Sequence, residues 1–341
     1  MIHLRIVVPS YQAEHVLELL KGTPSVINLI YLAGVAHKPE GDVILCDVAR
    51  EDASVIVSDL RELDVHLEGS IAIEEIDSSI SEASKRAEFA AEGAPGDAVV
   101  WEEVEARTSE EVALTANFIA FMVLAMLIAS VGVILDSPIL IIGAMVVGPE
   151  FGPLAALCVA VVQQRLDLAR RSLAALAIGF PLGITAAFLF TLVVKWTGLA
   201  PENFAADVHP LTQFLSHPDA FSFIVAYLAG TAGVLSLTST KSGALIGVLI
   251  SVATIPAAAN IAVAAAYTDW NEWRGAMAQL GVNLSAILLA GIATLFVQRK
   301  LYQRRRRRHL HHEAREAAGL PMGKSRREVL EAGPSRGRRG A

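Results

Sequence analysis

The chain has 341 residues, of which 53% are hydrophobic and 18% charged, and its formal net charge is −7. The mean hydropathy of +0.49 is too high for an ordinary soluble domain or a disordered chain. Two cysteines, Cys46 and Cys158, exclude a disulfide framework. The charge is also uneven. Residues 1–111 carry 23 acidic and 8 basic side chains, a net of −15, whereas residues 298–341 carry 4 and 14, a net of +10.

Residues 1–80 alternate short β-branched segments with amphipathic helical segments. We predict a helix capped by Ser10, a turn at 34–41, a helix opened by Glu51, and strands at 2–8, 26–32, 43–48 and 71–76. The order βαββαβ predicts a soluble α+β, ferredoxin-like domain. This arrangement resembles the ACT-like regulatory domains, which often dimerise and bind small metabolites. The first turn, Pro9-Ser10-Tyr11, departs from the pattern of the amino-acid-binding members, so we expect an assembly domain and leave metabolite binding open.

Residues 81–115 are rich in Glu and Ala and are interrupted by Gly93-Ala94-Pro95-Gly96. This pattern predicts a helical linker made of two amphipathic pieces with a hinge between them. The linker leads into the apolar part of the chain, and we expect it to act as a spacer.

Residues 116–300 are predicted to form an α-helical polytopic membrane domain. A membrane-spanning helix needs about 20 mainly apolar residues, and six segments qualify: 116–135, 138–162, 173–194, 221–238, 243–267 and 276–298. Lys and Arg favour short cytoplasmic loops, and the loop 163–171 is basic whereas the loop 197–220 is acidic. We therefore expect a multi-pass protein of the inner (plasma) membrane with both termini cytoplasmic, and no secretory signal peptide.

The membrane segments contain a weak internal repeat. Two very short connections, at 136–138 and at 239–242, are each followed by a proline and small residues, at Pro153 and at Pro256. Three spans that are duplicated insert the second time upside down, and such inverted repeats with interrupted helices place a transport site at the repeat interface. The sequence therefore predicts a possible 3+3 inverted repeat.

The second membrane segment carries the sharpest candidate for function, Glu150. The surrounding residues, Gly148, Pro149, Gly152 and Pro153, break a helix because proline has no N–H to donate and its ring clashes with the preceding turn. A carboxylate there either binds a cation or a proton, or is a protonated acid hydrogen-bonded to the broken helix; we favour the functional reading because ionisable groups inside membranes are usually functional. From its place in the segment we expect Glu150 close to the bilayer centre.

Other polar residues of the membrane segments are weaker candidates for the transport site. Thr254 can satisfy backbone freed by Pro256, while Asn260 and Asn283 are either interhelical hydrogen-bond partners or groups that line a pathway. At the outer hairpin, Asp136 and Ser137 either coordinate an ion or, as we prefer, cap the second helix.

Residues 301–341 are predicted to be a basic, disordered cytoplasmic tail. Its arginine run (Arg304, Arg305, Arg306, Arg307 and Arg308) is expected to contact anionic lipid head groups. Lipid contact and topology explain the arginines better than nucleic-acid binding does. The three histidines nearby make a weak case for a metal, and we expect none.

Four blocks of the chain resemble one family of prokaryotic membrane proteins. They read VGVILDSPILIIGAMVVGPEFGPLAA, HPDAFSFIVAYLAGTAGVLSL, SGALIGVLISVATIPAAANIAVA and LGVNLSAILLAGI. They are similar to the domain of unknown function 389, the "uncharacterised hydrophobic domain", over about 185 residues. That family usually has an apolar pair where this chain has Glu150-Phe151 and often Pro-Pro where it has Ile255-Pro256. The resemblance implies a multi-span membrane protein and supplies no activity.

No enzyme signature is present: the sequence has no phosphate-cradling Gly-rich loop, no zinc spacing and no nucleophile placed with a base. We therefore expect no enzyme and no cofactor. The favoured function is a transporter or channel for a small solute or ion, assembled or gated by the N-terminal domain as a homo-oligomer. The alternative is a membrane-anchored sensor or scaffold whose helices form an oligomeric anchor. The sequence identifies neither the solute, nor a coupling ion or direction, nor the oligomer number.

Overall fold

The computed structural model describes residues 1–76, 80–91, 99–201, 215–239, 244–326 and 329, with the backbone alone for 244–253. The chain divides into two compact units. We call Met1–Glu103 together with Gln298–Ala341 the head unit, and Val104–Val297 the helical unit. The sequence had placed boundaries at residues 80, 115 and 300, and had treated the C-terminal residues as a separate tail.

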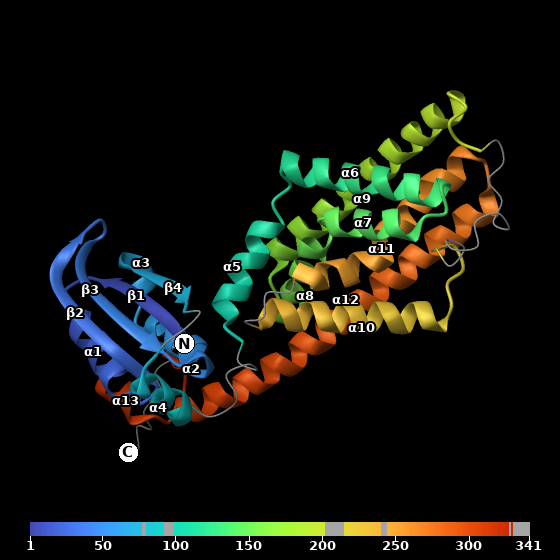
Figure 1. Cartoon of the computed structure of the whole chain (residues 1–341). Helices are drawn as coiled ribbons and strands as arrows, with labels where there is room; N and C mark the ends of the chain where they lie inside the picture. Colours follow the sequence, from blue (N-terminus) through green and yellow to red (C-terminus); the bar gives the residue numbers. More distant parts are fainter. Residues whose placement is uncertain (77–79, 92–98, 202–214, 240–243, 327–328, 330–341) are drawn as a thin grey trace, which may run out of the picture. The chain divides into compact units, whose positions relative to one another are not determined.

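The head unit is built on one antiparallel sheet of strands β1 (Ile2–Val8), β2 (Val26–His37), β3 (Glu40–Val48) and β4 (Ser70–Glu75). The strand order is β2-β3-β1-β4. Helices α1 (Ala13–Lys21) and α2 (Arg50–Glu62) connect β1 to β2 and β3 to β4, with a short α3 (Val65–Glu68) before β4 (Figure 1). This order and pairing give the split β-α-β arrangement that the sequence pattern predicted.

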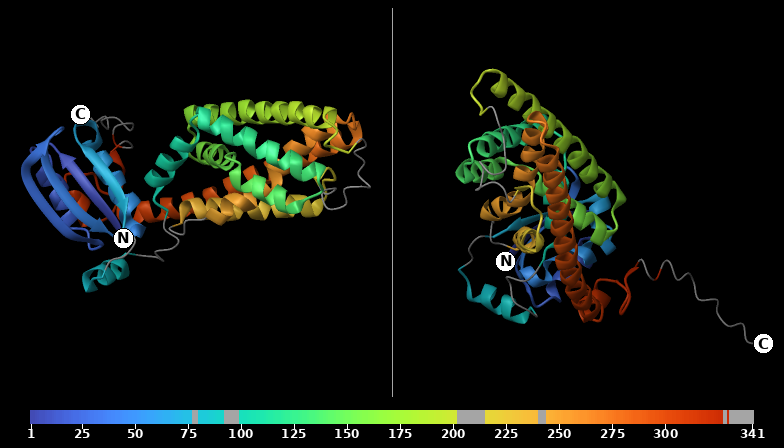
Figure 2. Two further views of the ribbon diagram at one scale, coloured as in Figure 1. Left: turned by 45° about the horizontal axis from the view of Figure 1, so that its top comes forward. Right: turned by 90° about the vertical axis from the view of Figure 1, so that its right-hand side faces the viewer.

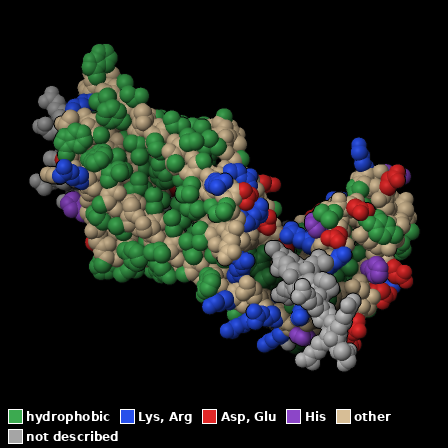
Figure 3. All heavy atoms as spheres, turned by 180° about the vertical axis from the view of Figure 1, so that it is seen from behind, with side chains coloured by type: hydrophobic (Ala, Val, Ile, Leu, Met, Phe, Trp, Pro, Cys, Tyr) green, Lys and Arg blue, Asp and Glu red, His purple; other side chains and the backbone are tan. Residues whose placement is uncertain are grey.

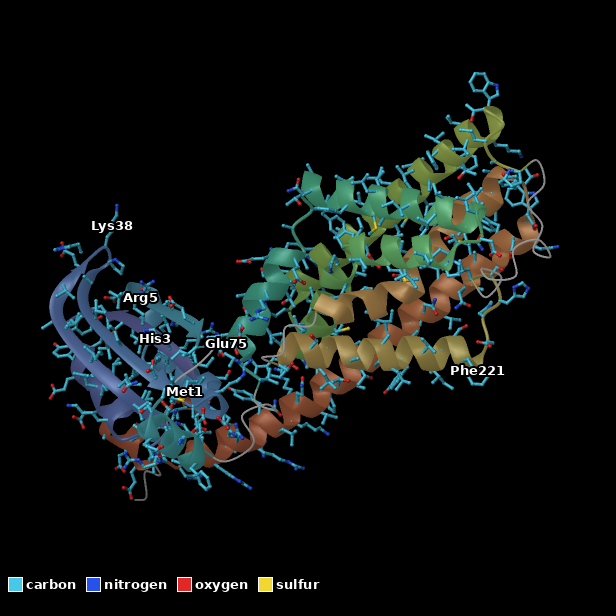
Figure 4. The ribbon with its side chains drawn as sticks, in the orientation of Figure 1. Met1, His3, Arg5, Lys38, Glu75 and Phe221 are labelled. Atoms are coloured by element: carbon cyan, nitrogen blue, oxygen red, sulfur yellow. The ribbon has the colours of Figure 1, made fainter. Side chains whose placement is uncertain are left out.

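Alternation along the strands explains why the helices lie on one face of the sheet. Successive side chains of a strand point to opposite faces, and Ile2, Leu4 and Ile6 of β1 are buried in one core cluster with residues of α1 and α2. On the opposite face lie His3 and Arg5, which are labelled on β1 in Figure 4. The cluster also includes Val100 and Ala318, so residues outside 1–80 complete this core.

Two local predictions in the head unit were wrong. The predicted turn at 34–41 is mostly strand, because β2 and β3 continue as a hairpin with Lys38 at its tip (Figure 4). Ser10 does not cap α1. The helix begins two residues after Tyr11, and the Ser10 hydroxyl instead donates a hydrogen bond of 2.8 Å to Asp42 Oδ1 on β3.

The C-terminal residues differ most from their prediction. Helix α12 (Trp270–His309) continues through the arginine run, and α13 (Glu313–Ala317) follows it. α13 packs against the end of α1, where a Cβ on Gly22 would lie 2.7 Å from Ala314 Cβ. Residues 301–326 are therefore part of the head unit and form an ordered, packed segment; residues 330–341 lie outside the described residues.

The predicted linker region contains helices α4 (Glu82–Ala90) and α5 (Trp101–Glu111), and the expected hinge at 93–96 lies outside the described residues. The helical unit continues with α6 (Ala116–Ile134), α7 (Pro138–Val147), α8 (Phe151–Gln163), α9 (Leu166–Trp196), α10 (Ala220–Thr238) and α11 (Ala244–Ala266), and with the larger part of α12 (Figure 2). Hydrophobic side chains cover most of its face in Figure 3. Such a surface suits contact with lipid.

Four of the described helices, α6, α9, α10 and α12, are long and apolar enough to cross a membrane. The pair α7 and α8, bent by 55° at its break, would be a fifth span. The remaining predicted segment corresponds to α11, whose first half is described by its backbone alone, and a sixth span stays a prediction. The basic loop at 163–171 is shorter than expected, since α9 begins at Leu166 and includes Arg170 and Arg171.

Candidate functional site

The break between α7 and α8 has the form that its sequence predicts. Proline disfavours the helical conformation in the residue before it, and Gly148 accordingly has an extended backbone with φ −65° and ψ 126°. Pro149 and Glu150 then separate the two helices. Pro153 lies in the first turn of α8, where its missing N–H would have no helical acceptor in any case.

Glu150 is fully buried, with 0% of its surface exposed. Its Oε1 accepts a hydrogen bond of 2.8 Å from the hydroxyl of Thr254, which lies on α11 two residues before Pro256. The structure therefore brings together the two proline-containing regions of the membrane segments, 104 residues apart. This contact also changes the interpretation of Thr254, because its hydroxyl donates to the carboxylate of Glu150 between α7 and α8.

Gly148 makes this approach possible. A Cβ on Gly148 would meet the Glu150 carboxylate and would lie 2.8 Å from Ile255 Cγ1. Real Cβ atoms essentially never show such distances, so a larger residue would force the side chain of Glu150 or Ile255 to shift. Gly152 is equally restricted, because a Cβ there would lie 2.7 Å from Glu111 Cβ, at the end of α5.

A cavity of about 410 Å³ reaches the break. One wall is formed by Gly148, Pro149, Phe151 and Gly152, and the other by residues of α5, of the connection after it and of the beginning of α6: Glu110, Glu111, Ala113, Thr115 and Phe118. The break thus lies beside the first turn of α6, and its depth in the bilayer stays a prediction.

The two proline-containing segments differ in the structure, because only one of them is interrupted. α7 and α8 are separate helices, but α11 runs unbroken from Ala244 to Ala266 with Pro256 inside it. The prediction of a matched pair of interrupted helices was wrong in this respect. A proline inside a helix need not end it when packing supports the turn, and the residues that follow Pro256 are buried in the core of the helical unit.

The two candidate asparagines lie on different helices, α11 and α12. Asn260 on α11 is 2% exposed, and its Oδ1 has no hydrogen-bond partner among the described residues. Asn283 on α12 accepts a hydrogen bond of 3.3 Å from Gln279 Nε2. Sequence reasoning missed Gln279, although its spacing of four from Asn283 on one apolar helix was the available signal.

At the outer hairpin, Asp136 has a left-handed backbone with φ 47° and joins α6 to α7. Ser137 occupies the N-cap position of α7, but its side chain makes no capping hydrogen bond. Tight packing holds the hairpin, since a Cβ on Gly132 would lie 2.8 Å from Ile141 Cγ1. The structure therefore shows no side-chain cap by Ser137.

Two basic residues of the helical unit have partners that the structure describes. Lys195 Nζ donates to the carbonyl of Ala266 at 3.3 Å and lies 4.5 Å from the centre of the Tyr267 ring. Arg165 pairs with Glu105 of α5. Lys241 lies outside the described residues.

The predicted lipid-binding arginines divide into two groups. Arg306 is largely buried and binds Asp59 and Glu62 of α2, while Arg305 Nη1 donates to the carbonyl of Glu51 at 2.6 Å. Arg304, Arg307 and Arg308 are exposed. No signal in the sequence marked the first group, because Asp59 and Glu62 resemble the acids of any solvated helix face.

Comparison with known proteins supports the family resemblance. Residues 145–289 match the family model described as "Domain of unknown function (DUF389)". An uncharacterized protein of Methanocaldococcus jannaschii is 26% identical over 196 residues, which cover 57% of this chain and 58% of that relative. The match therefore spans less than two thirds of the relative's length. No solved structure matches the chain. Together with the apolar helices, the family match identifies a membrane protein.

Proposed function

We propose that this protein is a transporter or channel for a small solute or ion, and that its pathway passes the break between α7 and α8. The observation that carries the proposal is the buried Glu150 carboxylate, held at 2.8 Å by Thr254 of another helix. A plain membrane anchor needs neither a broken helix nor a buried acid, because both are costly in lipid.

In the proposed mechanism Glu150 alternates between a protonated and a cation-bound state. The break frees backbone carbonyls, and such oxygens bind cations together with carboxylates in transporters with discontinuous helices. Thr254 orients the carboxylate and donates to it when it is charged. The cavity beside Glu110 and Glu111 is the proposed entrance, since its acidic wall would attract cations.

We further propose that α6 to α9 and α10 to α12 form the two halves of an inverted repeat. The hydrogen bond between Glu150 and Thr254 supports this proposal, because it joins equivalent proline regions of the two halves. The head unit is proposed to be an ACT-like domain that assembles the protein into a homo-oligomer. Ile30, Leu32 and Val35 of β2 support this, since large apolar residues exposed together suit a second copy. The exposed Arg304 is proposed to contact anionic lipid.

Flux into proteoliposomes tests the proposal. We would load them with a pH-sensitive dye and apply gradients of H⁺, Na⁺ or K⁺ in turn. Glu150→Gln keeps the shape of the protonated acid, so the protein should fold but lose the pH or cation dependence of its flux. Gly148→Ala should also abolish flux, whereas Gly143→Ala is a matched control, because a Cβ on Gly143 meets nothing within 4 Å.

Two results would contradict the proposal. If Glu150→Gln leaves flux and its pH dependence unchanged, the acid is structural and the pathway lies elsewhere. If the unmodified protein carries none of the three ions, and none of a panel of small solutes tested by swelling, the sensor or scaffold function becomes the better explanation.

A further inference from the structure

Both ends of the chain build the head unit, and a cluster of charges holds them together. Asp59 of α2, which is 0% exposed, accepts hydrogen bonds from Arg306, from His309 at 2.8 Å and from Arg315. Glu62 receives the second nitrogens of Arg306 and Arg315 at 2.7 and 2.8 Å. The position of the C-terminal segment on α2 is therefore specified by paired charges.

This attachment creates a pocket that the sequence did not suggest. Its volume is about 290 Å³, and its walls are the connection from α1 to β2, the first turn of α2, the end of α4 and the C-terminal segment. The basic lining residues are Arg305, Arg308, His309 and His312, and Asp52 is the acid among the described lining residues. Two arginines and one aspartate line the pocket, so its described lining has an excess of positive charge.

The polar groups around the pocket are mainly hydrogen-bond donors. His312 Nδ1 accepts from the backbone N–H of Ala314 at 3.4 Å, so the neutral ring carries its hydrogen on Nε2. The ring of His309 stacks on that of His312, with centroids 5.5 Å apart. Ser25 is 2% exposed, and its hydroxyl has no hydrogen-bond partner among the described residues. Donors of this kind, set beside guanidinium groups, fit an anion that carries several oxygens.

We propose that this pocket binds a phosphate group through Arg305, Arg308, His312 and Ser25. Its volume of about 290 Å³ lies just below the range for small-molecule sites, about 300–1,000 Å³, so it fits inorganic phosphate or one phosphorylated group better than a large cofactor. The phosphate can belong to a soluble molecule or to a lipid head group, because the recognised chemistry is the same. This site is independent of the break at Glu150.

The test uses the full-length protein and two neighbouring arginines. Arg308→Gln removes a charge that lines the pocket, whereas Arg307→Gln removes the same charge from an exposed position outside its lining. Ser25→Ala is a second variant that leaves the charge unchanged. In detergent, the binding of inorganic phosphate is measured by calorimetry. In nanodiscs, the retention of phosphatidic acid is compared with that of phosphatidylcholine.

Loss of an arginine that binds a phosphate directly should weaken binding about tenfold or more. Saturable phosphate binding that is lost in Arg308→Gln, reduced in Ser25→Ala and kept in Arg307→Gln supports a soluble ligand. The same ranking for phosphatidic acid, without phosphate binding in detergent, supports a lipid head group. The proposal is overturned if both arginine variants lose binding equally, or if the unmodified protein binds neither phosphate in detergent nor phosphatidic acid in nanodiscs.

Discussion

The attachment of the C-terminal segment to α2 makes a quantitative prediction for Asp59→Asn. Breaking a buried ion pair by removing one partner costs about 3–5 kcal/mol. Asp59 forms ion pairs with two arginines, and one of them, Arg315, is 0% exposed. Glu62 still binds both arginines in the variant, so we expect the lower end of the range, about 3 kcal/mol, or about a hundredfold in the equilibrium for local opening.

Amide hydrogen exchange of residues 310–320 measures this opening directly. Protection there should fall about a hundredfold in Asp59→Asn. The matched control is Asp64→Asn. The side chains of Asp64 and its partner Arg326 are about half exposed, at 47% and 48%, and pair at 2.9 Å. Exposed pairs contribute at most about 1 kcal/mol. If both variants exchange alike, the buried cluster does not hold the segment.

Two further predictions concern titration and topology. Glu51 is 3% exposed, its carboxylate makes no hydrogen bond to the described residues, and burial raises its pKa above 4.5. The fold favours the protonated carboxyl of Glu51. The stability that the protein has below pH 4.5 is therefore lost as the pH rises through the raised pKa that Glu51 has in the folded state. Glu51→Gln should therefore raise the unfolding temperature at pH 7.5 but not at pH 4; an equal gain at both would refute this reasoning. The topology predicts that both termini are cytoplasmic, so an impermeant thiol reagent on intact cells should label Glu202→Cys but not Gln303→Cys. The reverse pattern would contradict the topology. The native Cys46 and Cys158 are buried.

The sequence by itself was sufficient for features that depend on neighbouring residues. Alternating apolar residues predicted β1 from Ile2 to Val8, and β-α-β order predicted the sheet, because each strand must bury one face. The break after Val147 was predictable because Pro149 has no N–H and restricts Gly148 before it. Hydropathy located the membrane segments, since a lipid-facing helix has to be apolar.

The tertiary structure alone decided which distant residues meet. Nothing near Thr254 in the sequence indicates that its hydroxyl binds Glu150, and nothing near Asp59 indicates that Arg306 and Arg315 cover it. Likewise, α11 continues through Pro256 because its surroundings support the turn, whereas α7 ends before Pro149. Propensities act over a few residues, but the burial of a charge depends on packing between segments more than a hundred residues apart. The candidate residues could therefore be named from the sequence, while their partners required the fold.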